Sequence, residues 1–426
     1  MTDTNTSTRR DFLKTSALAA GAVAATMSVP RAVRAAGSDR LKVGLIGCGG
    51  RGGGAALQAL SADKGAVLHA IGDAFADALE SKLRAISNEK PAQVQVEDRK
   101  FIGFDAYQKV IDACDVVILT SPPGFRPAHL KAAVAANKHI FCEKPMATDA
   151  PGVRSVMQII QESQAKNISL VAGFCWRYSN AERAVFDKIH EGAIGNVSAI
   201  YSTYLTGELW SRPRKAEWSD MEWQVRSWLY FTWLSGDHIV EQAVHSIDKM
   251  AWAMQDEMPI SCTATGGRQV RTNPAFGNIY DHFAVAYEWK DGTRGFLACR
   301  QQNGCANDNS DYIMGTKGQA YVTGFRPGHR VEGENKWRYD GPKNDMYQAE
   351  HDLLFKSIRD GKPHNDGLRM INSTMMAIMG RMAAYTGQQL TWEKALESKE
   401  DLMPAKLEWG RIAVPEVAMP GRTKFI

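Results

Sequence analysis

The sequence predicts an α/β protein in which a doubly wound parallel sheet is followed by an α+β domain with an open, mostly antiparallel sheet. Residues 41–142 alternate short apolar strands with helices, which is typical of parallel sheets. A glycine-rich turn follows the first of these strands. Beyond residue 280, apolar and polar residues alternate in several segments, and this period of two predicts antiparallel strands.

The N-terminus carries a predicted export signal over residues 1–35. The segment TSTRRDFLKTS (6–16) contains the complete S/T-R-R-x-F-L-K pattern, and an Ala-rich run and a small-residue cleavage site follow it. The run is too short and too weakly apolar to span a bilayer. We therefore expect the twin-arginine translocase as a partner, a periplasmic protein, and no membrane anchoring after cleavage. The alternative is an irregular N-terminal tail.

The composition argues against several classes of protein. The 426 residues are 44% hydrophobic and 23% charged with a net charge of +4, as in an ordinary soluble globular protein. The signal holds five basic and two acidic residues, so +3 of this charge lies there and +1 remains, and no nucleic-acid partner is expected. Seven cysteines without a CxxC argue against a disulfide framework and fit folding in a reducing compartment before export.

The segment RLKVGLIGCGGRGG predicts a strand (Leu41–Ile46), a tight turn and a helix. Gly47, Gly49 and Gly52 fit the pattern G-x-G-x-x-G. The first permits the turn, the second lets backbone amides approach a pyrophosphate, and the third lets the helix pack on the strand. This arrangement predicts a Rossmann dinucleotide site with the pyrophosphate at the helix N-terminus.

A second predicted strand, AVLHAIGD, ends at Asp73, 21 residues beyond Gly52. An acidic residue at this spacing binds the adenosine ribose hydroxyls. Neither Ala74 nor Phe75 is an arginine that would accept a 2′-phosphate, so NAD is favoured and NADP is the alternative. Asp73 could instead only cap a turn.

Two further strands end in loops at the edge of the sheet where ligands bind. The first, Asp115–Leu119, leads to Ser121-Pro122-Pro123. The second, His139–Cys142, ends in Glu143-Lys144-Pro145. Because a proline restricts the backbone of the residue before it, we expect the backbone at Lys144 to be rigid.

With these motifs the chain resembles the Gfo/Idh/MocA oxidoreductases, which include glucose–fructose oxidoreductase and inositol dehydrogenase. The resemblance rests on the motifs above together with His129 and Trp176-Arg177-Tyr178, and it covers nearly the whole mature chain. It implies that Lys144 lies beside the nicotinamide and the substrate hydroxyl. It also implies a substrate contact for Tyr178 and cofactor contacts for Ser121, Pro122, His129, Glu143, Trp176 and Arg177.

The segment SGDHIVEQAVHSIDKMAWAM has the period of a single helix. Its apolar residues share one face: Val240, Val244, Ile247, Ala251 and Met254. Its acids and histidines share the opposite face: His238, Glu241, His245 and Asp248. Relatives carry an acid and a histidine four residues apart on this helix, a spacing that Glu241 and His245 match, although the acid is more often aspartate.

Oxidation of a carbinol sends a hydride to the nicotinamide and requires a base for the proton. An imidazole has a suitable pKa, so we predict His245 as the base. Lys144 would stabilise the developing alkoxide, and Glu241 would orient the imidazole. The alternative for His238, Glu241 and His245 is a zinc site, but the sequence shows no further ligand cluster and no metal is expected.

Residues 201–233 hold nine aromatic side chains, five of them tryptophans. Aromatic faces stack on sugars, and arginines bind hydroxyls or acidic substituents. We therefore expect substrate contacts from Tyr204, Trp210 and Arg212, together with His238, and name Arg214 and Arg226 as further candidates. The alternative is a loop packed against the sheet or a neighbouring subunit.

The remaining elements complete the second domain. IYDHFAVAYEW, TRGFLACRQQ and GQAYVTGFRP predict antiparallel strands, and helices are expected over 181–190 and 346–360. We place the NAD(P)-binding Rossmann domain at 36–165, the substrate-binding domain at 166–390 and a tail at 391–426. In relatives such a sheet often forms a subunit contact, so a homo-oligomer is expected.

The predicted function is nicotinamide-dependent oxidoreduction of a CH–OH group in a sugar, polyol or glycoside. Because free NAD is a cytoplasmic metabolite, an exported enzyme is expected to hold its cofactor tightly and to recycle it in place. Two alternatives share the fold. One is a redox-neutral NAD-dependent glycosidase that uses the same Lys144 and His245, and the other is a non-catalytic sugar-binding protein.

Overall fold

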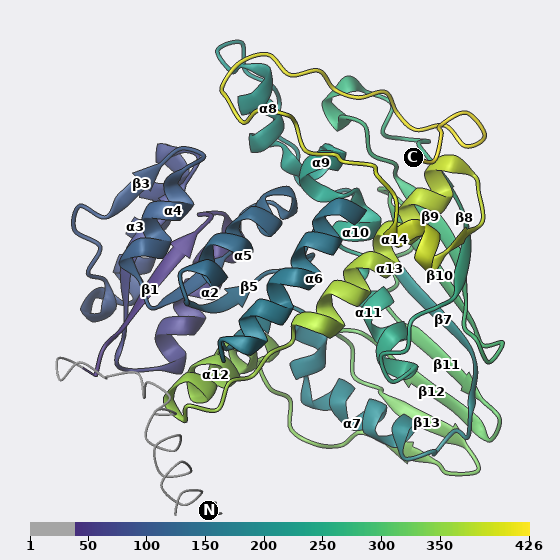
Figure 1. Cartoon of the computed structure of the whole chain (residues 1–426). Helices are drawn as coiled ribbons and strands as arrows, with labels where there is room; N and C mark the ends of the chain where they lie inside the picture. Colours follow the sequence, from purple (N-terminus) through teal and green to yellow (C-terminus); the bar gives the residue numbers. More distant parts are fainter. Residues whose placement is uncertain (1–38) are drawn as a thin grey trace, which may run out of the picture. The chain divides into compact units, whose positions relative to one another are not determined.

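The computed structural model describes residues 39–426 (Figure 1). The twin-arginine pattern and the rest of the predicted signal lie outside these residues. From Leu41 to Ile426 the chain forms one unit. No helix in this part of the chain is long and apolar enough to cross a membrane.

The first sheet has six parallel strands in the order β3-β2-β1-β4-β5-β6. Its strands are β1 (Leu41–Ile46), β2 (Ala66–Asp73), β3 (Lys100–Ile102), β4 (Val116–Leu119), β5 (His139–Cys142) and β6 (Leu170–Ala172). Its helices are α2 (Gly50–Ala62), α3 (Ala76–Glu89), α4 (Ala106–Ala113), α5 (Arg126–Ala135) and α6 (Ala150–Ala165). The strand order reverses between β1 and β4, which is where doubly wound sheets bind ligands. Since β6 follows α6, the sheet extends past residue 165, where the sequence placed the domain boundary.

The second sheet has nine strands in the order β14-β13-β12-β11-β7-β10-β9-β8-β15. They are β7 (Val197–Thr206), β8 (Ser261–Gly267), β9 (His282–Glu288), β10 (Arg294–Gln301), β11 (Asp311–Gly315), β12 (Gly318–Val322), β13 (Arg330–Gly333), β14 (Trp337–Arg338) and β15 (Leu390–Thr391). Strands β7 and β10 pair in parallel, and the other pairs are antiparallel. The predicted α/β architecture with an open, mostly antiparallel second sheet is confirmed.

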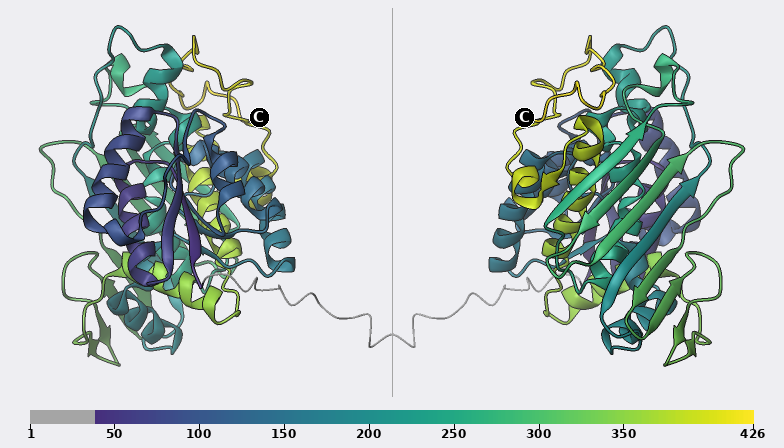
Figure 2. Two further views of the ribbon diagram at one scale, coloured as in Figure 1. Left: turned by 90° about the vertical axis from the view of Figure 1, so that its left-hand side faces the viewer. Right: turned by 90° about the vertical axis from the view of Figure 1, so that its right-hand side faces the viewer.

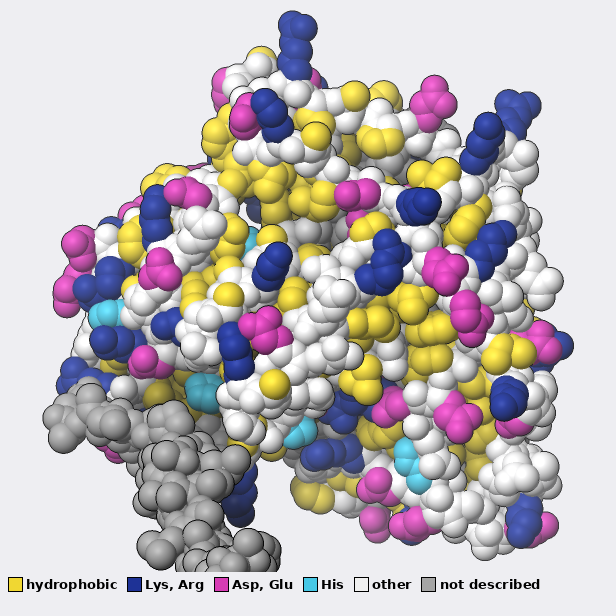
Figure 3. Space-filling model, in the orientation of Figure 1, with side chains coloured by type: hydrophobic (Ala, Val, Ile, Leu, Met, Phe, Trp, Pro, Cys, Tyr) yellow, Lys and Arg dark blue, Asp and Glu magenta, His cyan; other side chains and the backbone are white. Residues whose placement is uncertain are grey.

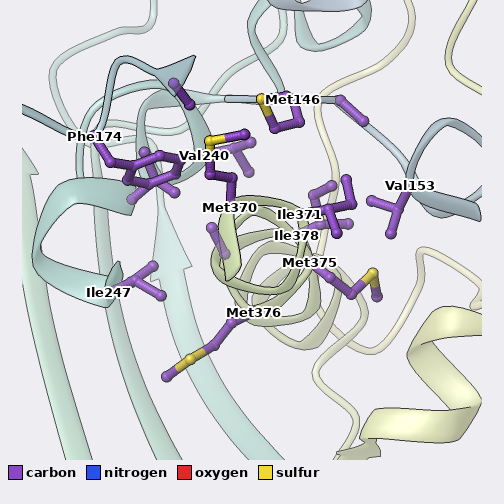
Figure 4. Packing of buried hydrophobic residues seen from close by; sticks show 14 of the residues in the cluster. Met146, Val153, Phe174, Val240, Ile247, Met370, Ile371, Met375, Met376 and Ile378 are labelled. Carbon is purple, nitrogen blue, oxygen red and sulfur yellow. The ribbon is translucent and has the colours of Figure 1, made fainter. Parts of the chain in front are cut away.

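Helices cover one face of the second sheet, while the other face is open to view in the right-hand panel of Figure 2. The covering helices are α7 (Asn180–His190), α11 (Val244–Ala253) and α13 (Gly367–Thr386). Figure 4 shows α13 end-on, with Met370, Ile371 and Met376 pointing in different directions into the core. Nearly every residue from Met370 to Thr386 is buried, so this helix lies inside the protein.

Helix α12 (Met346–Arg359) connects the two halves of the described unit. It follows β14 of the second sheet in sequence but packs against α2 and β5 of the first. Its Leu354 and Phe355 join the hydrophobic cluster that contains Val43 and Leu45 of β1. The site on the first sheet is therefore supported by residues from both halves of the chain.

The single helix predicted over 235–254 is interrupted. The structure forms α10 (His238–Glu241) and α11, and between them the Ala243 N–H donates to the carbonyl of His238, a spacing of five residues. The Gln242 side chain accepts from Gln301 of β10 at 2.7 Å, which anchors this wide turn to the sheet. Such turns recur at functional sites. Because the His245 N–H donates to Gln242, the carbonyl of Glu241 has no helical donor among the described residues.

Candidate active site

A cavity of about 530 Å³ lies at the carboxyl ends of β1, β2 and β4. Its first wall includes the predicted cofactor residues Gly47, Gly49, Gly52, Asp73, Ser121, Pro122 and His129. Its second wall comes from the aromatic segment: Trp210, Arg212, Val225, Arg226 and Trp228. Figure 3 shows hydrophobic side chains around a hollow between the region of α8 (Asp220–Arg226) and the N-terminal half. The volume is that of a small-molecule site.

The three motif glycines have different physical reasons to lack a side chain. Gly47 has φ +98°, and a Cβ there would lie 2.5 Å from the backbone nitrogen of Ser121. A Cβ on Gly52 would lie 2.0 Å from the carbonyl oxygen of Gly47. A Cβ on Gly49 would meet no described atom within 4 Å, so its bare backbone faces open space. Packing explains Gly47 and Gly52, and room for a pyrophosphate explains Gly49.

Asp73 ends β2 beside this turn. Its carboxylate accepts hydrogen bonds from the backbone N–H groups of Cys48, at 2.6 Å, and Phe75, at 2.9 Å. Burial raises its pKa above the ordinary value. These bonds hold the carboxylate at the edge of the cavity, as the binding of a ribose requires.

The structure brings an arginine to this end of the cavity that the sequence did not place there. The guanidinium carbon of Arg226 lies 3.9 Å from the ring centroid of Phe75. Its nitrogens bind Asp77 at 3.0 and 3.2 Å and Glu222 at 2.9 Å. A 2′-phosphate would therefore meet Asp73, Asp77 and Glu222 around one arginine that is already neutralised, which favours NAD.

Lys144 is held by two groups of Glu241. Its Nζ donates to the main-chain carbonyl of Glu241 at 2.5 Å and lies 3.3 Å from the carboxylate oxygen Oε1. The other carboxylate oxygen, Oε2, is buried without a partner among the described residues. Glu241 thus contacts Lys144 in the structure, whereas the sequence expected it to orient His245.

His245 lies in the first turn of α11, close to this pair. Burial, and then the positive charges of Lys144 and Lys249, lower its pKa well below the ordinary value. Its Nδ1 is buried and has no hydrogen-bond partner within residues 39–426. The imidazole is therefore neutral at physiological pH and available to a ligand. Lys249, one turn further along α11, is a contributor that the sequence did not single out.

A second group of charged residues, which the sequence analysis did not identify, lies behind the glycine turn. Arg51 pairs with Glu143 through its Nε, and its Nη2 lies 3.7 Å from Oε2 of Glu350 on α12. Glu350 is fully buried, neither of its carboxylate oxygens has a hydrogen-bond partner in the described chain, and burial raises its pKa well above the ordinary value. Arg51 thus links the glycine turn to the residue beside Lys144.

Two family matches cover most of the described chain. Residues 41–170 match the Gfo/Idh/MocA "Oxidoreductase family, NAD-binding Rossmann fold", and residues 183–321 match a "GFO/IDH/MocA C-terminal domain". The chain belongs to the Gfo/Idh/MocA oxidoreductase family. The predicted family, enzyme class and NAD cofactor are confirmed.

Individual proteins show the range of similarity. An inositol 2-dehydrogenase of Rhizobium meliloti is 28% identical over 289 residues, 67% of this chain and 77% of that protein. A glycosyl hydrolase family 109 protein of Streptomyces coelicolor is 27% identical over 170 residues, 39% of this chain and 34% of that protein. The structure of a levoglucosan dehydrogenase with NADH and levoglucosan has the same fold, with a TM-score of 0.66, 19% identity, and coverage of 83% of this chain and 99% of that one.

Other predicted site residues of this Gfo/Idh/MocA protein lie apart from the cavity lining. Arg177 is buried and binds Asp248 at 2.8 Å. Tyr178 donates to Asp366, and Trp176 packs against Phe325. The Nδ1 of His238 lies 2.9 Å from Asp237, and its Nε2 is buried without a partner in the described chain. Burial raises the pKa of Tyr204, whose hydroxyl is close enough to feel the charge of Glu241.

Of the predicted substrate residues, Trp210 and Arg212 line the cofactor cavity itself. The candidate Arg214 lies outside it, where it binds Asp220 at 2.6 Å. Within residues 39–426, no group of three or more His, Cys, Asp and Glu side chains is placed to hold a metal ion.

Proposed function

We propose that this enzyme oxidises or reduces a CH–OH group of a sugar, polyol or glycoside, with NAD bound in the cavity. The observation that carries the proposal is that an ammonium, a carboxylate and a neutral imidazole, on Lys144, Glu241 and His245, meet at the end of β5 of the dinucleotide-binding sheet. The similarity to an inositol 2-dehydrogenase and to the fold of a levoglucosan dehydrogenase supports this substrate class.

Each residue has a defined task in this proposal. When NAD is bound it would supply the hydride acceptor; Gly49 would leave room for its pyrophosphate, and Asp73 would bind its adenosine ribose. His245 takes the hydroxyl proton as general base, since its imidazole is neutral. Lys144 donates to the substrate oxygen and stabilises negative charge that develops there. Glu241 holds Lys144 in place.

The proposal extends to export by the twin-arginine route and to tight retention of NAD. The S/T-R-R-x-F-L-K pattern in residues 6–16 supports export of a folded protein. An exported protein has no pool of free NAD, so a cofactor loaded before export must be recycled in place. One substrate is then oxidised and another is reduced at the same site.

The similarity to a glycosyl hydrolase family 109 protein favours a second candidate. A redox-neutral glycosidase would use the same Lys144 and His245, with oxidation and reduction cancelling within one cycle. Analysis of the products separates the two, because only the glycosidase cleaves a glycosidic bond.

We also propose a homo-oligomer that contacts through the open face of the second sheet. Tyr321, Tyr312, Tyr201 and Phe296 lie opposite one another in register on four neighbouring strands. Tyr201 and Phe296 are 40% and 43% exposed, although both are large and apolar. If this row is an interface, Phe296→Asp should lower the molar mass measured by light scattering, and an unchanged mass would exclude the row.

The test of the main proposal uses the mature protein recovered from the periplasm. The protein is denatured, released nucleotide is assayed, and the native protein is offered a panel of aldoses, polyols and glycosides while reduced nicotinamide is followed by absorbance. We expect bound nucleotide and its reduction by at least one carbinol. If no compound of the panel reduces the bound nucleotide and no glycoside is cleaved, the proposed catalysis is refuted.

A further inference from the structure

Residues 207–236 form one side of the cofactor cavity although they follow β7 of the second sheet in the sequence. Arg226 closes the cavity at Phe75, two residues after the ribose-facing Asp73. Its stacking on Phe75 at 3.9 Å and its paired bonds to Asp77 fix it to the first sheet domain. Arginine stacked on an aromatic ring and bound by two parallel hydrogen bonds is well ordered.

The C-terminal tail reaches the same place from a third part of the sequence. The ring centroid of Trp409 lies 4.3 Å from that of Phe104 and 5.4 Å from that of Phe75. Both phenylalanines line the cavity. The tail therefore packs on the back of the two aromatic side chains that form the adenosine end of the site.

The tail and the aromatic segment also hold each other. The backbone N–H of Met221 donates to the carbonyl of Gly410 at 3.1 Å, and the Gln224 side chain donates to the carbonyl of Ile412 at 3.3 Å. Figure 1 shows the tail, in yellow, running past α8. The tail thus holds α8, the helix that ends at Arg226, while Asp77 and Phe75 hold Arg226 itself.

We propose that Arg226 and Trp409 form a clasp that encloses the adenosine end of bound NAD and slows its exchange. The clasp rests on the proposed retention of the cofactor and identifies the residues responsible for it. A dinucleotide lying between Asp73 and the second wall cannot leave at this end unless Arg226 separates from Phe75 and Asp77. Because three segments must part together, opening is rare and release is slow.

The experiment measures release of NADH, which does not require a known substrate. The purified full chain is loaded with NADH, mixed rapidly with excess NAD, and followed by nicotinamide fluorescence. The variants are Arg226→Ala and Trp409→Ala. The matched control is Arg214→Ala, which removes an arginine of the same segment that lies outside the cavity and binds Asp220.

We expect release about tenfold faster in each clasp variant, the effect of losing one stacked contact, and less than twofold faster in the control. Thermal unfolding confirms that the variants are folded. Release at the wild-type rate in both clasp variants would overturn the proposal, as would the same acceleration in the control. A wild type that releases NADH slowly but, when loaded with NAD, oxidises no carbinol would refute the proposed reaction and leave the clasp intact.

Discussion

The ammonium of Lys144 donates to the main-chain carbonyl of Glu241, which the break between α10 and α11 leaves without a helical donor. Lys144, whose backbone is restricted by Pro145, is thereby bound to the turn between α10 and α11 that precedes His245. The position of the ammonium depends on the backbone of residue 241 as well as on its carboxylate. This relationship separates the effects expected for substitutions at residues 144, 241 and 245.

Lys144→Ala and His245→Ala should each lower kcat by about 10²–10⁴-fold, because each removes a group that interacts with the transferring proton or the substrate oxygen. NADH binding, measured by fluorescence titration, should stay within a few-fold of the wild type. Glu241→Gln should cost less than either, since the carbonyl contact to Lys144 remains. An equal loss in all three variants would show that the carboxylate, and not the backbone, positions the lysine.

On the acid side, kcat/KM should decline with a midpoint below pH 6.5, the ordinary pKa of an imidazole. We call this decline the acid limb. Folding lowers the pKa of His245, so the base stays neutral and active at pH values where a free imidazole is protonated. Lys249 forms a buried ion pair with Asp311. Replacing both residues in Lys249→Met/Asp311→Asn takes away one of the two cations that lower the pKa of His245, and should move the limb to higher pH. A limb that stays in place in this variant would show that burial and Lys144 alone depress the pKa.

The sequence predicted the parts of the site that lie within a single motif, because strand, turn and helix are local. The cavity-lining glycines and Asp73 are examples. Arg226 could not be placed, because it meets Asp77 across 149 residues of chain through packing of the aromatic segment. Trp409 and Glu350 could not be placed either, because their partners Phe104 and Arg51 are also distant in the sequence. The helix break at residue 242 was also hidden, because the hydrophobic period of 235–254 is intact and the anchor is a side chain of β10.

Glu350→Gln should stabilise the protein increasingly as pH rises. Folding raises the pKa of Glu350, so between its unfolded and folded pKa values the folded state holds a proton that the unfolded state has lost. Stability therefore falls with pH in that window, by about 1.4 kcal/mol per pH unit, and a glutamine removes this loss. Chemical denaturation at pH 5 and pH 8 measures it, with the exposed Glu80→Gln as control. A variant less stable than wild type at both pH values would show that Glu350 is ionised and paired with Arg51.

Asp73→Ser/Asp77→Asn should move the cofactor preference from NAD toward NADP. The first change removes the carboxylate that faces the ribose, and the second releases Arg226 from its paired bonds and leaves Glu222 as its remaining partner. The freed guanidinium can then bind a 2′-phosphate, and the ratio of the dissociation constants of NADPH and NADH should fall by about 100-fold. Fluorescence titration of both nucleotides measures the ratio.

The single variant Asp77→Asn is the informative control for this change. If Asp73 alone repels the 2′-phosphate, Asp77→Asn should leave the ratio almost unchanged and Asp73→Ser should account for the whole effect. If Arg226 is the cation that NADP needs, each single variant should give part of the change and Arg226→Ala should cancel the gain of the double variant. A gain that survives Arg226→Ala would show that the phosphate is bound by another group, such as Arg212 on the same wall.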